Sequence, residues 1–440
     1  MASKNRTFPG GGVHPHDYKY LSNDIPIRNA PIPPEAVIAL QQHMGAPAEC
    51  LVAPGDEVRE GMLIGKAQGV FSANVHASIP GKVKEIRDIY LATGIRSKAV
   101  VVEFEGEFEG GGAAEGDWRS KDPQDLMELI RDQGIVGLGG ATFPTPIKFT
   151  IREGNKIEFF VINGVECEPF LTSDHRLMVE KTESLLTGVE IVSRILSPRR
   201  VLIGVEENKP DAIEALNREI SKKGLDIEVV SLKTKYPQGD EKQLLKTLIH
   251  REVPSGGLPL DIGAVVSNAG TIYAIYEAVA LGKPLIERIV TVTGSALKNP
   301  ANFKVRIGTP VGNLLEECGG FISTPGKIVA GGPMMGFALA DPGVPVVKGT
   351  SGILALSEKQ IRSGLQTPCI GCGRCIAACP FGLSPTALYK WIDHQEYDEA
   401  MAAGLMDCKE CGCCAYVCPA RIPLVQGMKL GKIMARKKKS

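Results

Sequence analysis

The sequence has no long uninterrupted apolar stretch. Its most apolar region, residues 262–281, is broken by Ser267, Asn268, Thr271 and Glu277, whereas a helix needs about 20 predominantly apolar residues to cross a bilayer. The first residues, MASKNRTFPGGG, have no apolar core of the kind found in a secretory signal peptide. We therefore expect a cytoplasmic chain without a transmembrane helix, either free or peripheral on the cytoplasmic side of a membrane.

The chain also lacks an excess of either charge. Its 50 basic residues balance 50 acidic residues, so neither a nucleic-acid partner nor strong electrostatic adhesion to a membrane is indicated. The basic tail at residues 435–439 (ARKKK) is more typical of a solvated tail than of a lipid contact. A secreted disulfide scaffold is not indicated either, because eight of the twelve cysteines lie in two rows, and the others are scattered: Cys50, Cys167, Cys318 and Cys413.

The two cysteine rows both read C-x2-C-x2-C-x3-C-P, over residues 369–380 and 408–419. In this bacterial iron–sulfur spacing, three close thiolates hold one cluster and the fourth reaches across to the other. Disulfides or zinc sites are the alternatives, but zinc usually takes two C-x2-C pairs separated by a longer loop. The spacing therefore predicts two [4Fe–4S] clusters, one held by Cys369, Cys372, Cys375 and Cys418, and one held by Cys379, Cys408, Cys411 and Cys414.

Clusters of this kind transfer one electron at a time. Cys413 stands beside the predicted ligand Cys414. It is either a spare thiol or a competing ligand.

Composition divides the 440 residues into several domains. Residues 1–104 begin with a polar, turn-rich stretch whose two histidines, His14 and His16, fit surface or docking roles better than a metal site. From residue 48 onward, short strands alternate with Pro-Gly turns and resemble the biotinyl/lipoyl-type barrel-sandwich fold. Val70 occupies the position of the modified lysine, which predicts a structural or docking module.

The remaining regions differ clearly from one another. Residues 105–120 are acidic and glycine-rich, as expected of a linker. Residues 121–285 alternate strands and helices, which predicts a Rossmann-like parallel α/β domain with ligand loops at the carboxyl ends of its strands. Residues 286–341 suggest a small β-grasp module, and residues 357–434 a helical two-cluster domain. The predicted fold is therefore a multidomain α/β protein.

Two stretches of the α/β region are candidates for ligand binding. The glycine-rich segment 134–148 could let a phosphate approach the backbone. It is not a G-x-G-x-x-G and it follows a helix, so a flexible turn explains it nearly as well. Asn163, Glu166 and Glu168 follow a predicted strand, where turn and helix-capping roles are equally good explanations.

These two stretches and two further segments of the α/β region resemble the NADH-binding flavoprotein subunit of respiratory complex I. The matching segments are GGATFPTPIK at 139–148, NGVECEP at 163–169, YPQGDE at 236–241 and NAGT at 268–271. The resemblance implies that FMN lies against Gly139, Gly140, Lys148, Asn163, Gly239 and Asn268, and that NADH lies near Phe143, Glu168 and Glu241. Glu166 is included among the cofactor-binding candidates. Val165 replaces an aspartate of that family, so we expect one polar contact to the flavin to be missing.

The chain as a whole resembles the C subunits of Rnf ion-translocating complexes. The motifs FPGGGVHPHDYK, GLGGATFPTPIKF and VINGVECEPFLTSDHR and both cysteine rows occur in the same order, over residues 5 to about 430. A long alanine- and lysine-rich extension of some members is absent, so roles tied to it do not transfer. The family's β-grasp module is of the SLBB type.

This resemblance implies a protein that binds NADH or NAD⁺, FMN and two [4Fe–4S] clusters. It would serve a membrane-bound ferredoxin:NAD⁺ oxidoreductase that couples electron transfer to ion translocation, and it would lie peripherally on the cytoplasmic face. The implied partners are the other Rnf membrane subunits, the ferredoxin-type cluster subunit and, indirectly, ferredoxin. No side chain is expected to act as a general acid or base.

Two alternatives stay open. A cobalamin-reductase-like flavoprotein would share these motifs from the glycine segment onward, but the module at 48–104 favours the Rnf family. An electron-relay adapter would carry the clusters without a working flavin site, and the substitution at Val165 is its main support.

Overall fold

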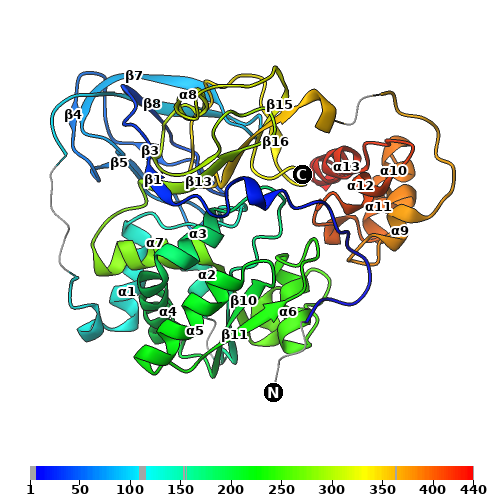
Figure 1. Ribbon diagram of the computed structural model, residues 1–440, viewed down its shortest axis with the longest axis horizontal. Coiled ribbons are helices and arrows are strands. Elements are labelled where there is room, and N and C mark those ends of the chain that lie inside the picture. The colour runs from blue at the N-terminus through cyan, green and yellow to red at the C-terminus, as the bar shows by residue number, and fades with distance from the viewer. Residues whose placement is uncertain (1–5, 109–114, 152–153, 155, 362–363, 440) are drawn as a thin grey trace.

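The computed structural model describes residues 6–108, 115–151, 154, 156–361 and 364–439. Four modules lie around a long N-terminal segment, which is dark blue in Figure 1. Residues 109–114 of the predicted linker lie outside the described residues. In the described part of the chain, no helix is long and apolar enough to span a membrane.

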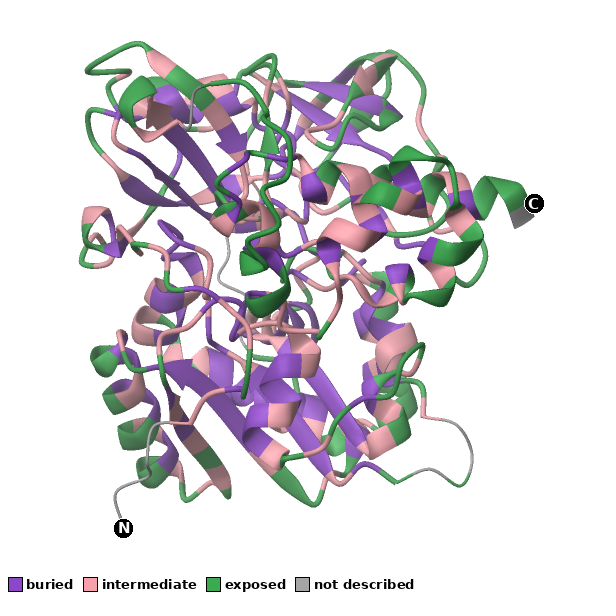
Figure 2. Cartoon of the chain, turned by 90° about the vertical axis from the view of Figure 1, so that its right-hand side faces the viewer, coloured by how far each residue is buried: buried purple, intermediate pink, exposed green. Residues whose placement is uncertain are grey.

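The α/β module (residues 115–285) is built on a sheet of four parallel strands in the order β11-β10-β9-β12. Their residues are mostly apolar because helices cover both faces. Figure 2 displays these strands in the lower half of the molecule, largely buried. The strands are β9 (Phe159–Asn163), β10 (Arg200–Glu206), β11 (Ile227–Leu232) and β12 (Ala264–Asn268).

Alternate strand residues face the two sides of this sheet. Phe160 and Ile162 of β9 pack against one set of helices, and Phe159 and Val161 pack on the opposite face. The first set comprises α1 (Pro123–Asp132), α4 (Thr182–Leu196), α5 (Pro210–Lys223) and α7 (Ala269–Ala280). The opposite face is covered by α6 (Glu241–Ile249). Two shorter helices, α2 (Thr145–Phe149) and α3 (Ser173–Glu180), complete the module.

The strand order contains a reversal of direction. The chain first moves outward from β9 through β10 to β11, and then returns to place β12 on the other side of β9. In open α/β sheets, ligands bind at the carboxyl ends of the two strands that flank such a switch point. Here those strands are β9 and β12, which end at the paired residues Asn163 and Asn268.

The sandwich module (residues 35–108) consists of two small sheets packed on an apolar core. This confirms the predicted barrel-sandwich architecture. One sheet contains β2 (Glu35–Ala39), β4 (Glu57–Val58), β7 (Gly81–Tyr90) and β8 (Arg96–Phe104), and the other contains β3 (Glu49–Cys50), β5 (Leu63–Lys66) and β6 (Val75–His76).

The β-grasp module is a six-stranded mixed sheet with one helix, α8 (Val311–Glu317). Two of its strands lie outside the predicted 286–341 range. One comes from near the N-terminus and pairs with β14, and the other follows residue 341 and pairs with β13 and β15. In sheet order they are β1 (Ile27–Asn29), β14 (Ala301–Arg306), β13 (Glu287–Thr293), β17 (Gly352–Ser357), β15 (Pro325–Ala330) and β16 (Phe337–Ala338).

The cysteine module (residues 364–439) is helical, as predicted, and lies at the right of Figure 1. Leu388 and Ile392 of its second helix are buried together with Met428 of its last helix. Pro385 opens the second helix, where a missing N–H costs nothing. The helices are α9 (Arg374–Ala377), α10 (Pro385–Asp393), α11 (Tyr397–Ala402), α12 (Cys413–Val417) and α13 (Leu424–Lys439).

The N-terminal strap (residues 6–22) joins these modules through backbone hydrogen bonds. Gly12 N–H donates to Ala378 O in the cysteine module at 2.9 Å. The next residue, Val13, exchanges two backbone bonds with Tyr236 of the α/β module, at 2.8 and 2.9 Å. Gly11 lies so close to the cysteine module that an added Cβ would be 2.5 Å from Cys379 O.

Candidate functional site

The switch point carries two asparagines side by side. Asn163 Nδ2 donates to Gly239 O at 2.8 Å, which fixes the loop before α6 against the end of β9. Asn268 caps α7 by accepting from Thr271 N–H, and its Nδ2 donates to Asp174 Oδ2 at 2.6 Å. Because the two residues pair in register, their side chains leave the sheet at the same edge. Three predicted flavin contacts, Asn163, Gly239 and Asn268, therefore converge here.

The glycine loop (residues 137–143) lies over this edge. Gly137 N–H donates to Phe143 O at 2.8 Å and closes the loop, and Leu138 N–H donates to Thr271 Oγ1 at 2.8 Å and anchors it to α7. Gly139 lies against Asn268, since an added Cβ would be 3.3 Å from Asn268 Cβ.

Gly140 provides the open part of this loop. It has a φ of +112°, and an added Cβ would find open space. A side chain is disfavoured at this φ, and the bare backbone lets an anionic ligand approach closely.

Lys148 and Glu241 form an ion pair between α2 and the start of α6. Lys148 Nζ lies 2.5 Å from Glu241 Oε1, and each side chain is about one-third exposed. The pair brings together one residue predicted to contact FMN and one predicted to contact NADH. A partly exposed pair of this kind contributes little to stability, so both side chains remain available to a ligand.

Glu166 acts as a helix cap. Its φ is +46°, and its carboxylate accepts from Asp174 N–H at 2.8 Å and His175 N–H at 3.2 Å at the start of α3. A carboxylate at this position satisfies free N–H groups and complements the helix dipole. Of the two explanations left open by the sequence, the capping role is therefore present in the fold.

Glu168 is held by the β-grasp module. Its two carboxylate oxygens accept from Met335 N–H at 2.9 Å and Met334 N–H at 3.1 Å. Burial raises the pKa of Glu168 to about 7, and these hydrogen bonds oppose that shift only in part. Glu168 thus couples the 163–169 segment to the turn after β15, and both carboxylate oxygens already have partners.

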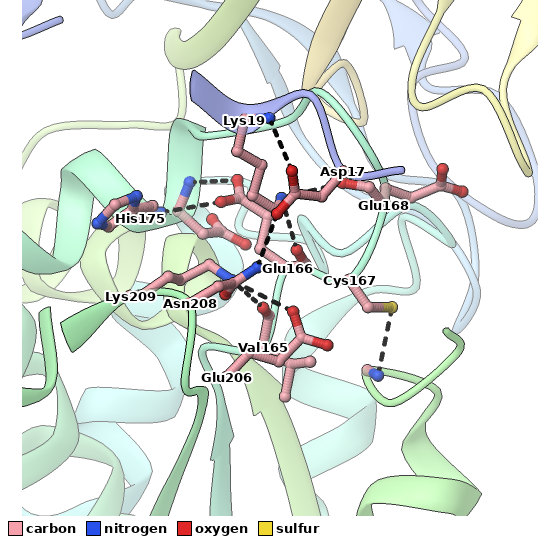
Figure 3. Close-up of polar contacts among 12 residues, drawn as sticks. Asp17, Lys19, Val165, Glu166, Cys167, Glu168, His175, Glu206, Asn208 and Lys209 are labelled. Carbon is pink, nitrogen blue, oxygen red and sulfur yellow. Dashed lines mark hydrogen bonds and ion pairs between the residues drawn. The ribbon is translucent and has the colours of Figure 1, made fainter. Parts of the chain in front are cut away.

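Two lysines hold the backbone of this segment (Figure 3). Lys19 Nζ, from the strap, donates to three carbonyl oxygens, those of Glu166, Glu168 and Leu171, at 2.9, 3.0 and 2.5 Å. Lys209 is fully buried, and its Nζ donates to Val165 O at 2.8 Å. Burial lowers the pKa of Lys19.

Val165 does not leave a gap. Its side chain is fully buried in the core on the α6 face of the sheet, together with Leu232 and Leu244. The substitution of the aspartate is therefore accommodated by apolar packing.

The residues around the switch point fit a flavin mononucleotide. The Gly139–Gly140 backbone and Lys148 offer N–H groups and a positive charge to a phosphate, and the two asparagines offer amides to a heterocycle. The structure brings most of the predicted residues to this edge of the sheet. Glu166 and Glu168 instead lie farther along the 163–169 segment, where they bind α3 and the β-grasp module.

Cys379 and the four cysteines between residues 408 and 414 line one cavity of the cysteine module. Apolar side chains, among them Phe381 and Met428, line most of the rest of it, together with Lys409 and Glu410. The four predicted ligands in this cavity, here called the inner cysteines, are Cys379, Cys408, Cys411 and Cys414. Four thiolates in an apolar hollow fit a [4Fe–4S] cluster.

The other predicted ligands are here called the outer cysteines: Cys369, Cys372, Cys375 and Cys418. Cys375 and Cys418 are buried in one apolar cluster, whereas Cys369 and Cys372 are exposed. Over the described residues, no three His, Cys, Asp or Glu side chains could share a single metal ion. The thiolates of a cubane bind separate irons, so they need not converge on one ion.

The inner cysteines face the α/β module. Gln243 Nε2 in α6 donates to Pro380 O at 2.9 Å, next to Cys379. Cys413 is fully buried, and its Sγ lies 3.9 Å from Tyr236 O, on the α/β side. Cys413 therefore packs in the interface between the two modules.

The family comparisons match each module in turn. The RnfC barrel sandwich hybrid domain matches residues 6–107, and the Nuo51 FMN-binding domain matches residues 130–277. The SLBB domain matches residues 289–338 and the 4Fe-4S dicluster domain matches residues 368–422. This order confirms the predicted fold class.

Full-length relatives decide the family. The C subunit of the Na(+)-translocating ferredoxin:NAD(+) oxidoreductase complex of Acetobacterium woodii is 41% identical over 100% of both chains. The chain belongs to the RnfC family, the C subunits of Rnf complexes. Within the RnfC family, the C subunit of the proton-translocating ferredoxin:NAD(+) oxidoreductase complex of Clostridium ljungdahlii is 46% identical over 89% of this chain and 85% of that protein. The C subunit of the ion-translocating oxidoreductase complex of Rhodobacter capsulatus is 41% identical over 96% and 82%.

A solved structure shares the fold of this RnfC-family chain. A chain of the NAD⁺-reducing [NiFe]-hydrogenase in the H₂-reduced state aligns with a TM-score of 0.51 and 17% identity, over 74% of this chain and 64% of that chain. This chain thus spans less than two thirds of the hydrogenase chain, and the likeness concerns the fold alone.

Several residues that support the RnfC site are not predictable from its motifs. Lys19 and Lys209 hold the 163–169 segment, and Asp174 holds Asn268, but the sequence singles out none of the three. The available signal for Lys19 is its place in the HPHDYK motif, next to the two histidines. Its burial could not be predicted from the sequence, because the carbonyl groups that it binds lie 147 to 152 residues away and leave no local pattern.

Proposed function

We propose that this chain is the NADH- or NAD⁺-binding flavin and iron–sulfur subunit of a membrane-bound ferredoxin:NAD⁺ oxidoreductase that couples electron transfer to ion movement. One observation carries the proposal: a Rossmann-type switch point and the cavity of the inner cysteines lie on opposite sides of a shared interface within one chain. A flavin at the first and a cluster at the second would be neighbours. The enzyme class is an ion-translocating NAD-dependent oxidoreductase.

The residues of the switch point would hold the cofactor and substrate. When bound, FMN supplies the exchange between a two-electron hydride and single electrons. Lys148 and the Gly139–Gly140 backbone would bind its phosphate. Asn163, Asn268 and the backbone of Gly239 would orient its ring system, and Glu166 would position that site through α3.

The other face of the site would take the nucleotide. Phe143 and Glu241 would contact NADH. Glu168 would shape the NADH pocket by holding the turn after β15 in place. Exclusion of water by the β-grasp turn over Glu168 would protect the hydride transfer.

The inner cysteines would bind the cluster nearer the flavin. Their module contacts α6 and the strap through Pro380 and Ala378. The outer cluster would lie nearer solvent, because Cys369 and Cys372 are exposed. Electrons would therefore pass between the flavin and the inner cluster, and then between the outer cluster and another subunit.

The relatives are named as the C subunits of multisubunit complexes, so other Rnf subunits are partners of a chain of this family. We propose that the membrane subunits and the ferredoxin-type cluster subunit are the direct or indirect electron partners, with ferredoxin reached through them. We also propose a peripheral position on the cytoplasmic face, where NADH is available.

The test is cofactor analysis of the anaerobically purified chain, followed by NADH titration. We expect about one FMN and about eight irons per chain, and bleaching of the flavin and cluster absorbance by NADH. Protein that is replete in iron and sulfide but binds neither FMN nor NADH would refute the proposal. That result would favour the electron-relay adapter.

The structure weakens the two alternatives. The adapter depended on Val165, whose side chain is buried in the core. A cobalamin-reductase-like protein would begin near the glycine loop, whereas the relatives align over the sandwich module as well.

A further inference from the structure

The tip of the sandwich module touches the glycine loop. Met44 N–H donates to Thr142 O at 3.0 Å. The rings of Phe71 and Phe143 lie edge to face, with centroids 5.9 Å apart and an interplanar angle of 68°. Phe71 stands next to Val70, at the hairpin where biotinyl- and lipoyl-type domains carry their lysine. The hairpin that would carry a swinging arm is therefore packed beside the candidate site.

Hydrogen bonds hold the tip of the sandwich module in a defined conformation. Phe71 O accepts from Ala46 N–H at 2.8 Å, and Ser72 Oγ donates to Ala46 O at 3.0 Å. His43 Nε2 lies within hydrogen-bond distance of both Ala46 O and Ser72 Oγ. Burial lowers the pKa of His43 to about 4, so the ring is neutral at physiological pH. Phe71 is thus held in place by the backbone on either side of it.

Despite this rigid backbone, the ring of Phe71 is not buried. It is 51% exposed, and Met44 beside it is 50% exposed. Two large apolar side chains at this exposure, next to the open backbone of Gly140, form a hydrophobic corner with Phe143. Exposure of such a corner to water is unfavourable, and covering it with an apolar or aromatic group is favourable.

We propose that Phe71 adds a second aromatic ring beside Phe143 and stacks on the adenine ring of the nicotinamide dinucleotide, so that the sandwich module contributes directly to substrate binding. This inference rests on the proposed function. The nicotinamide must reach the flavin at the edge marked by Asn163 and Asn268, so the other end of the dinucleotide extends outward along the glycine loop. A purine is flat, uncharged and aromatic, and it can stack on a phenylalanine ring.

The test compares binding of NADH with binding of reduced nicotinamide mononucleotide, which lacks the adenylate. Equilibrium affinities are measured on the FMN-loaded chain for wild type, Phe71→Ala, Phe71→Tyr and Val70→Ala. Phe71→Ala should weaken NADH binding about five- to hundredfold, as expected for the loss of one base–aromatic stack. Its affinity for the mononucleotide should stay within about twofold of wild type, because the mononucleotide makes no such stack.

Two variants serve as controls. Phe71→Tyr keeps an aromatic ring and should retain wild-type NADH affinity. Val70 is the neighbouring exposed apolar residue, 72% exposed, and Val70→Ala should also bind NADH as wild type does. FMN content and thermal unfolding of each variant verify that the tip has folded.

Three outcomes count against the inference. Unchanged NADH affinity in Phe71→Ala would show that the ring does not contact the nucleotide, and would leave docking of another subunit as the use of this corner. An equal loss of affinity for both nucleotides would assign Phe71 to the shape of the glycine loop instead. A wild-type chain that binds FMN but neither nucleotide would overturn the proposed function itself.

Discussion

At the residue scale, the most informative position is the pair Cys413 and Cys414. Adjacent cysteines in a cluster motif leave the ligand ambiguous in the sequence. In the structure, Cys413 and Cys414 both line the cavity of the inner cysteines, and Cys414 also packs against Cys375 and Cys418. Cys413 begins α12 and packs against Tyr236 and Val13 in the interface with the α/β module and the strap. Because Cys413 is packed in this interface while Cys414 keeps the C-x2-C spacing from Cys411, we assign Cys414 as the ligand.

This assignment predicts different outcomes for two serine variants. Cys414→Ser should lose the inner cluster, so that iron falls from about eight to about four per chain. Cys413→Ser should keep both clusters, because it removes only a buried contact near Tyr236 O. Iron analysis and EPR of the reduced proteins measure the difference. Loss of a cluster in Cys413→Ser, with Cys414→Ser unaffected, would reverse the assignment.

At the scale of single elements, the strap has a clear physical role. Lys19 is buried and donates to three carbonyl oxygens of the 166–171 loop. Asp17 O accepts from Phe170 N–H at 2.7 Å, and Tyr18 stacks on the Phe170 ring. The strap thus supplies partners for backbone groups that would otherwise be buried without hydrogen bonds.

Lys19→Met should therefore destabilise the α/β module. The methionine fills a similar volume but leaves up to three buried carbonyls without a donor, at about 1–3 kcal/mol each. We expect a loss on the order of 3 kcal/mol or more in unfolding free energy, together with release of FMN at a lower temperature. Thermal unfolding monitored by flavin fluorescence measures both effects.

An exposed lysine gives the matched control. Lys66 lies at the end of β5 on the surface, and Lys66→Met should unfold at the wild-type temperature. If Lys19→Met also did so, the carbonyls would have found other partners, and the strap would not support the loop.

The same elements show what local sequence patterns can predict. The cysteine rows specify clusters because the ligand spacing is local, and the alternation of strands and helices over residues 121–285 is predictable because the apolar runs of its strands are local too. Glu166 and Glu168 were singled out, but whether they cap a helix or contact a turn depends on Asp174 and Met334, which only the fold brings near. The strap contacts of Lys19 depend wholly on distant residues.

At the scale of the whole molecule, three modules meet at one buried lysine. Lys348 Nζ donates to Asn74 O of the sandwich module at 2.6 Å and to Gly134 O of the α/β module at 2.7 Å. Lys348 N–H donates to Gln42 Oε1 at 3.0 Å. The loop that carries Lys348 also packs at Thr142, since a Cβ on Gly349 would be 2.6 Å from its methyl group. The junction therefore supports the glycine loop from behind.

Burial lowers the pKa of Lys348 to about 7, from 10.5 in an exposed lysine. Between these two pH values the unfolded chain holds a proton that the folded chain does not. The contribution of Lys348 to stability is therefore fully present only at alkaline pH, and it is lost as the pH falls toward 7. The slope is at most about 1.4 kcal/mol per pH unit.

Lys348→Met should remove this dependence. The variant leaves Asn74 O and Gly134 O unpaired and should be about 2–4 kcal/mol less stable than wild type at pH 9. The difference in unfolding free energy should shrink by about 1 kcal/mol for each pH unit between pH 9 and pH 7. The reason is that only wild type must deprotonate a lysine when it folds, which becomes harder as the pH falls. Urea unfolding followed by tryptophan fluorescence at pH 7, 8 and 9 measures it, with Lys66→Met expected to track wild type throughout. A constant difference between Lys348→Met and wild type across this range would mean that the junction holds a charged lysine, and that its three modules are joined by an ammonium rather than an amine.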